Sequence, residues 1–334
     1  MCNISGFVVI GLLFFACSSP QKHMVRFLAF DTDIDVTIYS PSSNVERDID
    51  SLKALCTRIE DKLSISKPES EIYRINHRSD SVVVVSDTLK RILSVCRKEY
   101  ASSGGLFDVT VEPLKYLYGL ESHQKTNHVP TRAELDTAMS HIGFGRIRFQ
   151  SDSILVIPLG MHLDFGGIAK GYLLITLQKF LIAKGYSSFL VNGGGDLIAV
   201  GLKPDKKQWV IGIQNPRVST ELVSTIPVND HCVFTSGDYE RFFIQNGIRY
   251  HHLFNPKTGL PGRYNSSATV IGTNPLTTDA AVKIAFLMPP EKAVDYLTTR
   301  NLPGLLIDTA GVGWANAAMK PLLQPEPGFV VNYR

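Results

Sequence analysis

Apolar and polar residues first alternate with the period of a strand. Every second residue between Asp33 and Tyr39 is apolar, which predicts a strand with one buried face. Apolar residues then recur every three or four positions up to Leu63, and again from Leu89 to Tyr100, which is the spacing of two amphipathic helices. Cys56 and Cys96 lie on these two stripes, so we interpret them as small core residues.

The middle of the chain predicts two more helices and a hairpin. A capping box formed by Thr131 and Glu134 begins a helix of about ten residues. Two short apolar runs on either side of residues 151–152 indicate a hairpin. After Asp164 a glycine-bearing turn opens a long amphipathic helix, which Gly185 ends.

The second half of the chain is mostly typical of strands. The expected strands are Ser188–Val191, Trp209–Ile213, Leu222–Pro227, Cys232–Thr235, Arg241–Gln245, Arg249–Phe254 and Ala268–Ile271. Two short helices near residues 277–287 and 290–298 precede a closing pair of strands. No repeat or linker interrupts residues 23–334, so we predict one α+β domain whose sheet is largely antiparallel and flanked by helices.

Composition is that of an ordinary globular protein. Of its 334 residues, 44% are hydrophobic and 19% are charged. The formal net charge is only +3, and no long lysine or arginine cluster is present, which argues against nucleic acid as a partner. The cysteines are too scattered for a disulfide framework, and none has the spacing of a zinc site.

The N-terminus has the features of an export signal. Residues 6–16 form an apolar run that is too short to span a bilayer comfortably, and the run stops at Cys17. This resembles the lipobox of bacterial lipoproteins, although residues 1–5 lack a basic residue and Phe14 is unusually large. We expect residues 1–16 to be a signal peptide, Cys17 to be lipidated and residues 17–22 to form a tether. The protein would then be extracytoplasmic, in the cell envelope; the alternatives are an N-terminal anchor and a misplaced start codon.

Four polar, glycine-rich segments stand at the ends of predicted strands or helices. They are Asp164–Gly171, Asn192–Asp196, Thr235–Tyr239 and His251–Gly259. Glycines there let backbone amides approach a ligand, and the N-terminus of the helix after Gly167 would attract a phosphate. Lys170 adds a positive charge beside it. Taken alone, each segment is more typical of an ordinary turn than of a binding site.

Together and in this order, the segments resemble the ApbE family of FAD:protein FMN transferases. The resemblance covers roughly residues 27–320. The other matching stretches are Phe30–Thr32, Ser70–Asn76, Gly105–Asp108 and Thr277–Ala281. It implies a T-fold-related α+β domain with an FAD cleft. The residues that it places against FAD are Phe30, Leu106, Phe107, Asp108, Asp164, Lys170 and Phe254.

The resemblance also implies a reaction and a metal. His252 would be the general base that takes the proton from a threonine or serine hydroxyl of an extracytoplasmic acceptor protein, which then receives FMN while AMP leaves. The alternative role for His252 is a histidine hydrogen-bonded in a turn. In the family, Mg²⁺ is held by the backbone carbonyl at the position of Gly167, by Asp279 and by an oxygen one helical turn later.

Three departures from the family pattern affect these expectations. Lys283 stands where the family supplies the last metal ligand, and an ammonium cannot bind Mg²⁺. Its spacing suits an ion pair with Asp279 instead. Asn255 replaces an aspartate near the phosphates, and Ser66 replaces an aromatic ring beside the flavin.

The metal question therefore leaves two interpretations. Either Lys283 supplies part of the charge of the metal, or it swings away and Asp279 with water molecules holds Mg²⁺. For the whole protein we consider three functions: an FMN transferase, a lipoprotein that retains FAD or hydrolyses it slowly, and a surface lipoprotein whose glycine segments are only turns.

Overall fold

The computed structural model describes residues 19–120 and 126–334. The predicted signal peptide of residues 1–16 and Cys17 lie outside the described residues. Within the two described ranges, no helix has both the length and the apolar character needed to cross a membrane.

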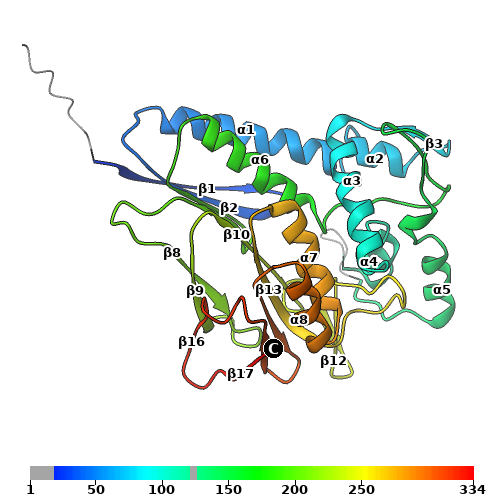
Figure 1. Cartoon of the computed structure of the whole chain (residues 1–334). Helices are drawn as coiled ribbons and strands as arrows, with labels where there is room; N and C mark the ends of the chain where they lie inside the picture. The colour runs from blue at the N-terminus through cyan, green and yellow to red at the C-terminus, as the bar shows by residue number, and fades with distance from the viewer. Residues whose placement is uncertain (1–18, 121–125) are drawn as a thin grey trace, which may run out of the picture.

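A nine-stranded sheet runs through the molecule (Figure 1). Every pair of neighbouring strands is antiparallel except the last, β15 with β17. The predicted largely antiparallel sheet is thus confirmed. In spatial order the strands are β1 (Gln21–Ala29), β2 (Thr32–Ser40), β6 (Phe189–Gly193), β7 (Asp196–Val200), β10 (His231–Gly237), β13 (Asn265–Gly272), β14 (Gly304–Asp308), β15 (Gly313–Ala315) and β17 (Val331–Tyr333).

Helices cover one face of this sheet and enclose the main core (Figure 1). They are α1 (Val45–Leu63), α6 (Ala169–Ala183), α7 (Pro275–Leu287) and α8 (Pro290–Thr299). Cys56 and Cys96 are buried in this core as free thiols, as their stripes predicted. Strand β13 is buried along its whole length because it is covered on both faces, which fits its run of small and apolar residues.

A second, smaller core lies on the opposite face of the sheet. Trp209, Ile213 and Ile226 pack there against Val233 and Ile307 of the large sheet. The covering layer is a three-stranded sheet of β8 (Trp209–Gln214), β9 (Leu222–Val228) and β16 (Gln324–Pro325).

The described residues between α1 and α6 build a lobe at one end of the molecule (Figure 1, right). Its elements are α2 (Glu71–Asn76), α3 (Asp87–Ser102), α4 (Glu112–Tyr118), α5 (Arg132–Ser140), a 3-10 turn (Phe144–Arg146) and the small sheet of β3 (Val82–Val84), β4 (Arg148–Phe149) and β5 (Ile154–Val156). A third core joins α4 and α5 to the hairpin of β11 (Phe242–Gln245) and β12 (Ile248–His251).

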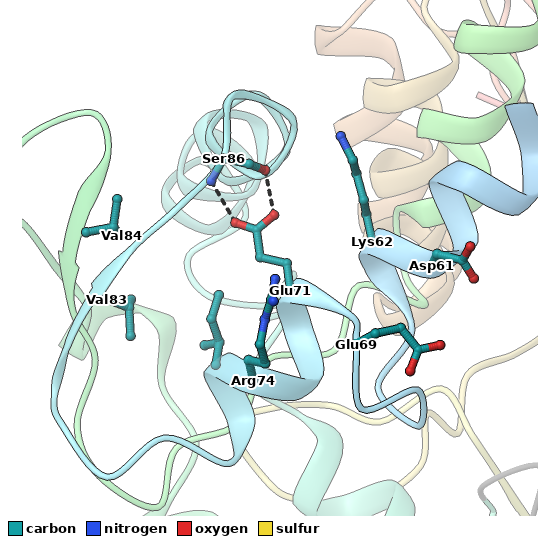
Figure 2. A pocket seen from close by; sticks show the side chains of 9 residues that line it. Asp61, Lys62, Glu69, Glu71, Arg74, Val83, Val84 and Ser86 are labelled. Carbon is teal, nitrogen blue, oxygen red and sulfur yellow. Dashed lines mark hydrogen bonds between the residues drawn. The ribbon is translucent and has the colours of Figure 1, made fainter.

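An open cleft of about 550 Å³ lies where α1, α2 and β3 meet (Figure 2). Its walls carry charges of both signs, among them Asp61, Lys62 and Arg74. Glu71 spans it and accepts hydrogen bonds from the backbone N and the hydroxyl of Ser86, at 2.6 and 2.5 Å (Figure 2). Glu71 thus holds Ser86, the residue that caps α3 by accepting from the Leu89 amide, and none of the predicted site residues lines the cleft.

Polar side chains of the lobe fix the chain just before Asp164. The Asn76 amide donates to the carbonyl of Leu163 at 2.9 Å, and its oxygen accepts from the Leu163 amide at 2.8 Å. The Arg78 guanidinium donates to four carbonyls, including that of Met161 at 3.0 Å. The position of Asp164 therefore depends on the end of α2.

Most locally patterned elements are confirmed, including the capping box at Thr131 and the hairpin of β4 and β5. Gly185 follows α6 with a φ of +85°, as a helix-ending glycine should. The predicted strand Arg249–Phe254 is too long: β12 ends at His251, and Phe254 forms only an isolated bridge with Pro261. Strand β1 begins at Gln21, so the last two residues of the predicted tether already pair with β2.

Candidate active site

Three lysine–aspartate ion pairs surround the loop from Asp164 to Gly171. All three carboxylates are buried, with residue exposures of 6% or less. The pairs are Lys115 with Asp164, Lys170 with Asp196, and Lys283 with Asp279. The six residues lie on three helices, a loop and a hairpin, so the fold brings the three pairs together; only Asp279 and Lys283 are neighbours along the chain.

Asp164 begins the loop and is held at three points. Its amide donates to the carbonyl of Val109 at 2.7 Å, and its Oδ1 accepts from the amide of Gly166 at 2.7 Å. Its Oδ2 pairs with Lys115 of α4. Burial alone would raise the pKa of Asp164, but the Lys115 ammonium and the Gly166 amide hold it below its usual value. Asp164 is therefore a carboxylate, and Lys115 is a site residue that the sequence did not indicate.

Asp196 closes the glycine turn between β6 and β7. Gly194 and Gly195 both have positive φ, at +61° and +89°, so the two strands are joined by a two-residue hairpin. Asp196 accepts from the amide of Thr235 at 2.9 Å and pairs with Lys170. Although burial lowers the pKa of Lys170, the nearby carboxylates hold it above its usual value. Lys170 is thus a fixed cation in the first turn of α6.

A cavity of about 270 Å³ lies on the other side of the glycine turn. It is bounded by Asn192, Gly195 and Thr235 on the large sheet and by residues 210–213 of β8. Residues of two glycine-rich segments, Asn192–Asp196 and Thr235–Tyr239, thus line the same cavity. Its volume is too small for a whole dinucleotide.

Asp279 and Lys283 form the expected ion pair one turn apart on α7. Asp279 is fully buried; its Oδ1 pairs with Lys283, and its Oδ2 accepts from the Gly171 amide at 2.8 Å. Burial raises the pKa of Asp279, and Lys283 acts against that rise. The Lys283 side chain passes along Gly167, where a Cβ would lie 3.5 Å from Lys283 Cδ. The three residues predicted to form the metal site are therefore adjacent.

The two neighbouring histidines differ in their free nitrogens. His251 is 2% exposed and uses both nitrogens: Nε2 donates to the Gly262 carbonyl at 2.7 Å, and Nδ1 accepts from the Leu253 amide at 3.3 Å. His252 is half-buried, and its Nδ1 lies 3.3 Å from the Arg241 carbonyl. A carbonyl only accepts, so Nδ1 carries the proton and Nε2 is the basic nitrogen, with no partner in the described part of the chain.

The surroundings of His252 keep its ring neutral. Burial is the largest cause, and the positive charges of Lys115 and Arg241 add to it, so that the pKa of His252 lies well below the usual value. At neutral pH the ring can therefore accept a proton at Nε2. Within the described residues, His252 thus keeps a free basic nitrogen, whereas both ring nitrogens of His251 are engaged.

Phe30 is held in a strained turn. Phe30 and Asp31 join β1 to β2 and both have a φ of +54°, which is unusual for a bulky residue. The turn lies beside the glycine hairpin, since the Gly194 amide donates to the Asp33 carbonyl at 3.1 Å. Such strain persists only where the surroundings enforce it, which is common at ligand sites.

The remaining predicted FAD contacts are buried or half-buried. Asp108 accepts from the amide and the hydroxyl of Thr110 and from the Phe144 amide, at 2.6–3.0 Å, so it fixes the backbone around it. Phe107 is 5% exposed beside Gly167, and Leu106 is half-buried. Phe254 is 4% exposed and packs on Tyr118 in the third core, with ring centroids 4.9 Å apart. Their contacts with FAD remain predictions.

The chain is similar to known flavin transferases in sequence and in structure. A sequence model of the ApbE family matches residues 30–306. An FAD:protein FMN transferase of Vibrio cholerae is 28% identical over 289 residues, which are 84% of this chain and 85% of that protein. One of Klebsiella pneumoniae is 30% identical over 252 residues, 74% of this chain and 77% of that protein. The ApbE protein of Thermotoga maritima superposes with a TM-score of 0.85 at 28% identity, covering 90% of this chain and 99% of that one.

Proposed function

The chain belongs to the ApbE family, and we propose that it is an FAD:protein FMN transferase that attaches FMN to a threonine or serine hydroxyl of an extracytoplasmic acceptor protein. The observation that carries the proposal is the neutral ring of His252, whose basic Nε2 has no partner among the described residues and whose surroundings include the positive charges of Lys115 and Arg241. The names of the relatives support the reaction, and the lipobox at Cys17 supports the location.

The site supplies a charge environment for a diphosphate. The N-terminus of α6 begins beside Gly167, where backbone amides and the helix dipole favour an anion. Lys170 lies in the first turn of α6, the side chain of Lys283 passes along Gly167, and Lys115 and Arg241 add positive charge near His252. The diphosphate of FAD is therefore expected along the Asp164–Gly171 loop.

The proposed step is a displacement at phosphorus. His252 Nε2 takes the proton from the acceptor hydroxyl, and the oxygen forms a bond to the phosphorus of the FMN half. The bond between that phosphorus and the bridging oxygen breaks, and AMP leaves with the electron pair. The lysines stabilise the negative charge that spreads over the phosphoryl oxygens.

The residues present do not fit the Mg²⁺ ion that the family pattern implies. One oxygen of Asp279 pairs with the Lys283 ammonium and the other accepts from Gly171, while the methylenes of Lys283 lie against Gly167. Among the described residues, no group of three or more His, Cys, Asp or Glu side chains is placed to hold a metal. We therefore route no step through a metal ion.

The same lysine favours one alternative function. If Lys283 blocks the chemistry, the protein is an FAD-binding lipoprotein that retains FAD or hydrolyses it slowly. Transfer and retention differ in whether the acceptor becomes covalently flavinylated.

The test incubates the purified protein with FAD and an acceptor domain, and measures in-gel flavin fluorescence of the acceptor. We expect labelling by wild type and a loss of at least about a hundredfold in His252→Ala, the usual contribution of a general base. His231→Ala, an exposed histidine on β10, is the matched control and should label like wild type. Unchanged labelling in His252→Ala would show that the base is misassigned, and FAD binding without labelling by wild type would favour the alternative.

A further inference from the structure

The Asp279–Lys283 pair occupies the position at which the family pattern places a metal. We propose that the ammonium of Lys283 is a built-in cation that replaces the divalent metal in this chain, so that FAD binding and FMN transfer need no Mg²⁺. This inference rests on the proposed function and deepens it.

The carboxylate of Asp279 is already fully engaged. Asp279 has no exposed surface, and its two oxygens face the Lys283 ammonium and the Gly171 amide. Mg²⁺ requires oxygen ligands at about 2.0–2.1 Å in octahedral geometry and gives up its water reluctantly. To bind here it would have to displace an ammonium from a carboxylate that water does not reach. The Lys283 ammonium already supplies one of the two positive charges that Mg²⁺ would bring.

Packing keeps the lysine in this place. The Lys283 side chain is 16% exposed, and its Cδ and Cε lie 3.5 and 3.8 Å from the position of a Cβ at Gly167. Swinging away would expose these methylenes and leave the buried Asp279 without its paired ammonium, which is strongly unfavourable. This disfavours the interpretation in which Asp279 and water hold Mg²⁺.

The ammonium can still serve a diphosphate. Of its three N–H donors, one points at Asp279 Oδ1 and one at the Asp279 carbonyl, 3.3 Å away. The third has no partner among the residues described, and the start of α6 lies next to it. A phosphate oxygen at that point would share Lys283 with Asp279. The transfer step stays balanced, because it requires only a proton acceptor and fixed positive charge.

The first test is direct and needs no variant. Mn²⁺, which accepts the same oxygen ligands as Mg²⁺, is titrated into wild-type protein with FAD, and its electron paramagnetic resonance signal is recorded. We expect the signal of the free aqua ion to persist. FAD affinity, measured by quenching of flavin fluorescence, and acceptor labelling should agree within about twofold between EDTA and Mg²⁺, which is under 0.5 kcal/mol.

A variant restores the metal site as a positive control. In Lys283→Thr a hydroxyl replaces the ammonium, so we expect the variant to bind Mn²⁺, to lose about tenfold or more in FAD affinity in EDTA and to recover it in Mg²⁺. Lys292→Thr, an exposed lysine on α8, should behave like wild type.

The outcomes separate this inference from the proposed function. Binding of Mn²⁺ by wild type, or labelling that EDTA abolishes and Mg²⁺ restores, would overturn the built-in cation even if the protein is a transferase. Metal-independent FAD binding without labelling would support the built-in cation while the transferase proposal fails. Wild type that binds no FAD in either buffer would overturn both.

Discussion

Replacing Gly171 with alanine measures how closely α6 and α7 cross. A Cβ there would lie 2.7 Å from the carbonyl oxygen of Pro275 and 2.9 Å from Asp279 Cβ, whereas ordinary contacts begin at 3.4 Å. The first obstacle is backbone, so α7 must move as a unit. Overpacking of this kind costs about 1–3 kcal/mol. The movement also strains the bond from the Gly171 amide to Asp279, and hydrogen bonds to charged groups contribute about 1.5–3 kcal/mol.

Helix propensity acts in the opposite direction, since alanine is favoured over glycine by about 1 kcal/mol in a helix. We therefore expect Gly171→Ala to lower the free energy of unfolding by about 1–3 kcal/mol, measured by urea denaturation followed by circular dichroism. Lys179→Ala on the exposed side of α6 is the control and should stay within about 0.5 kcal/mol of wild type. If Gly171→Ala is as stable as wild type or more so, α6 and α7 are not in close contact at Gly171.

Three further predictions concern the site. Because the pKa of His252 is lowered, its ring stays neutral as the pH falls, and labelling should decline only at a pH well below the usual histidine range. Lys115→Met removes one of the charges that lower this pKa. The acid limb of its pH–rate profile should therefore move to higher pH. Gly194→Ala and Gly195→Ala both place alanine at positive φ, but a Cβ overlaps a threonine hydroxyl only at Gly194 and meets no described atom within 4 Å at Gly195. The melting temperature should therefore fall clearly more in Gly194→Ala. Equal falls in the two variants would contradict the close approach at Gly194. Phe30→Gly relieves a positive φ but removes a ring that packs against the main core and loosens the unfolded chain, so no gain in stability is expected in urea. FAD binding should weaken, and unchanged FAD affinity would remove Phe30 from the site.

Sequence patterns predicted the elements whose apolar residues face the core in a regular period. They failed for β1, an edge strand, because its apolar residues Met24 and Leu28 are exposed. Apolar residues therefore stand on both faces of the strand, and the alternation that marks a buried face is lost. They also missed α4, a helix of seven residues with a proline at its start, and with it the site residue Lys115. Short helices carry too few periods to be distinguished from a turn.

The chemistry of the site depended on contacts between distant residues. The sequence predicted the Asp279–Lys283 pair because one helical turn separates them, but Lys115 and Asp164 lie 49 residues apart. The different roles of His251 and His252 follow from the carbonyls of Gly262 and Arg241, which no local pattern places. Asp108 keeps a family motif, yet its oxygens bind backbone amides and a hydroxyl of its own lobe.

If Cys17 carries the proposed lipid, the early start of β1 limits where the enzyme can work. With the proposed lipid on Cys17, four peptide steps separate the anchor from Gln21, the first residue of the sheet, and a fully extended chain covers about 14 Å over that length. The catalytic domain would then lie against the bilayer and diffuse with it in two dimensions. Acceptors tethered to the same membrane would meet it at a high effective concentration, whereas acceptors elsewhere would rarely reach the site.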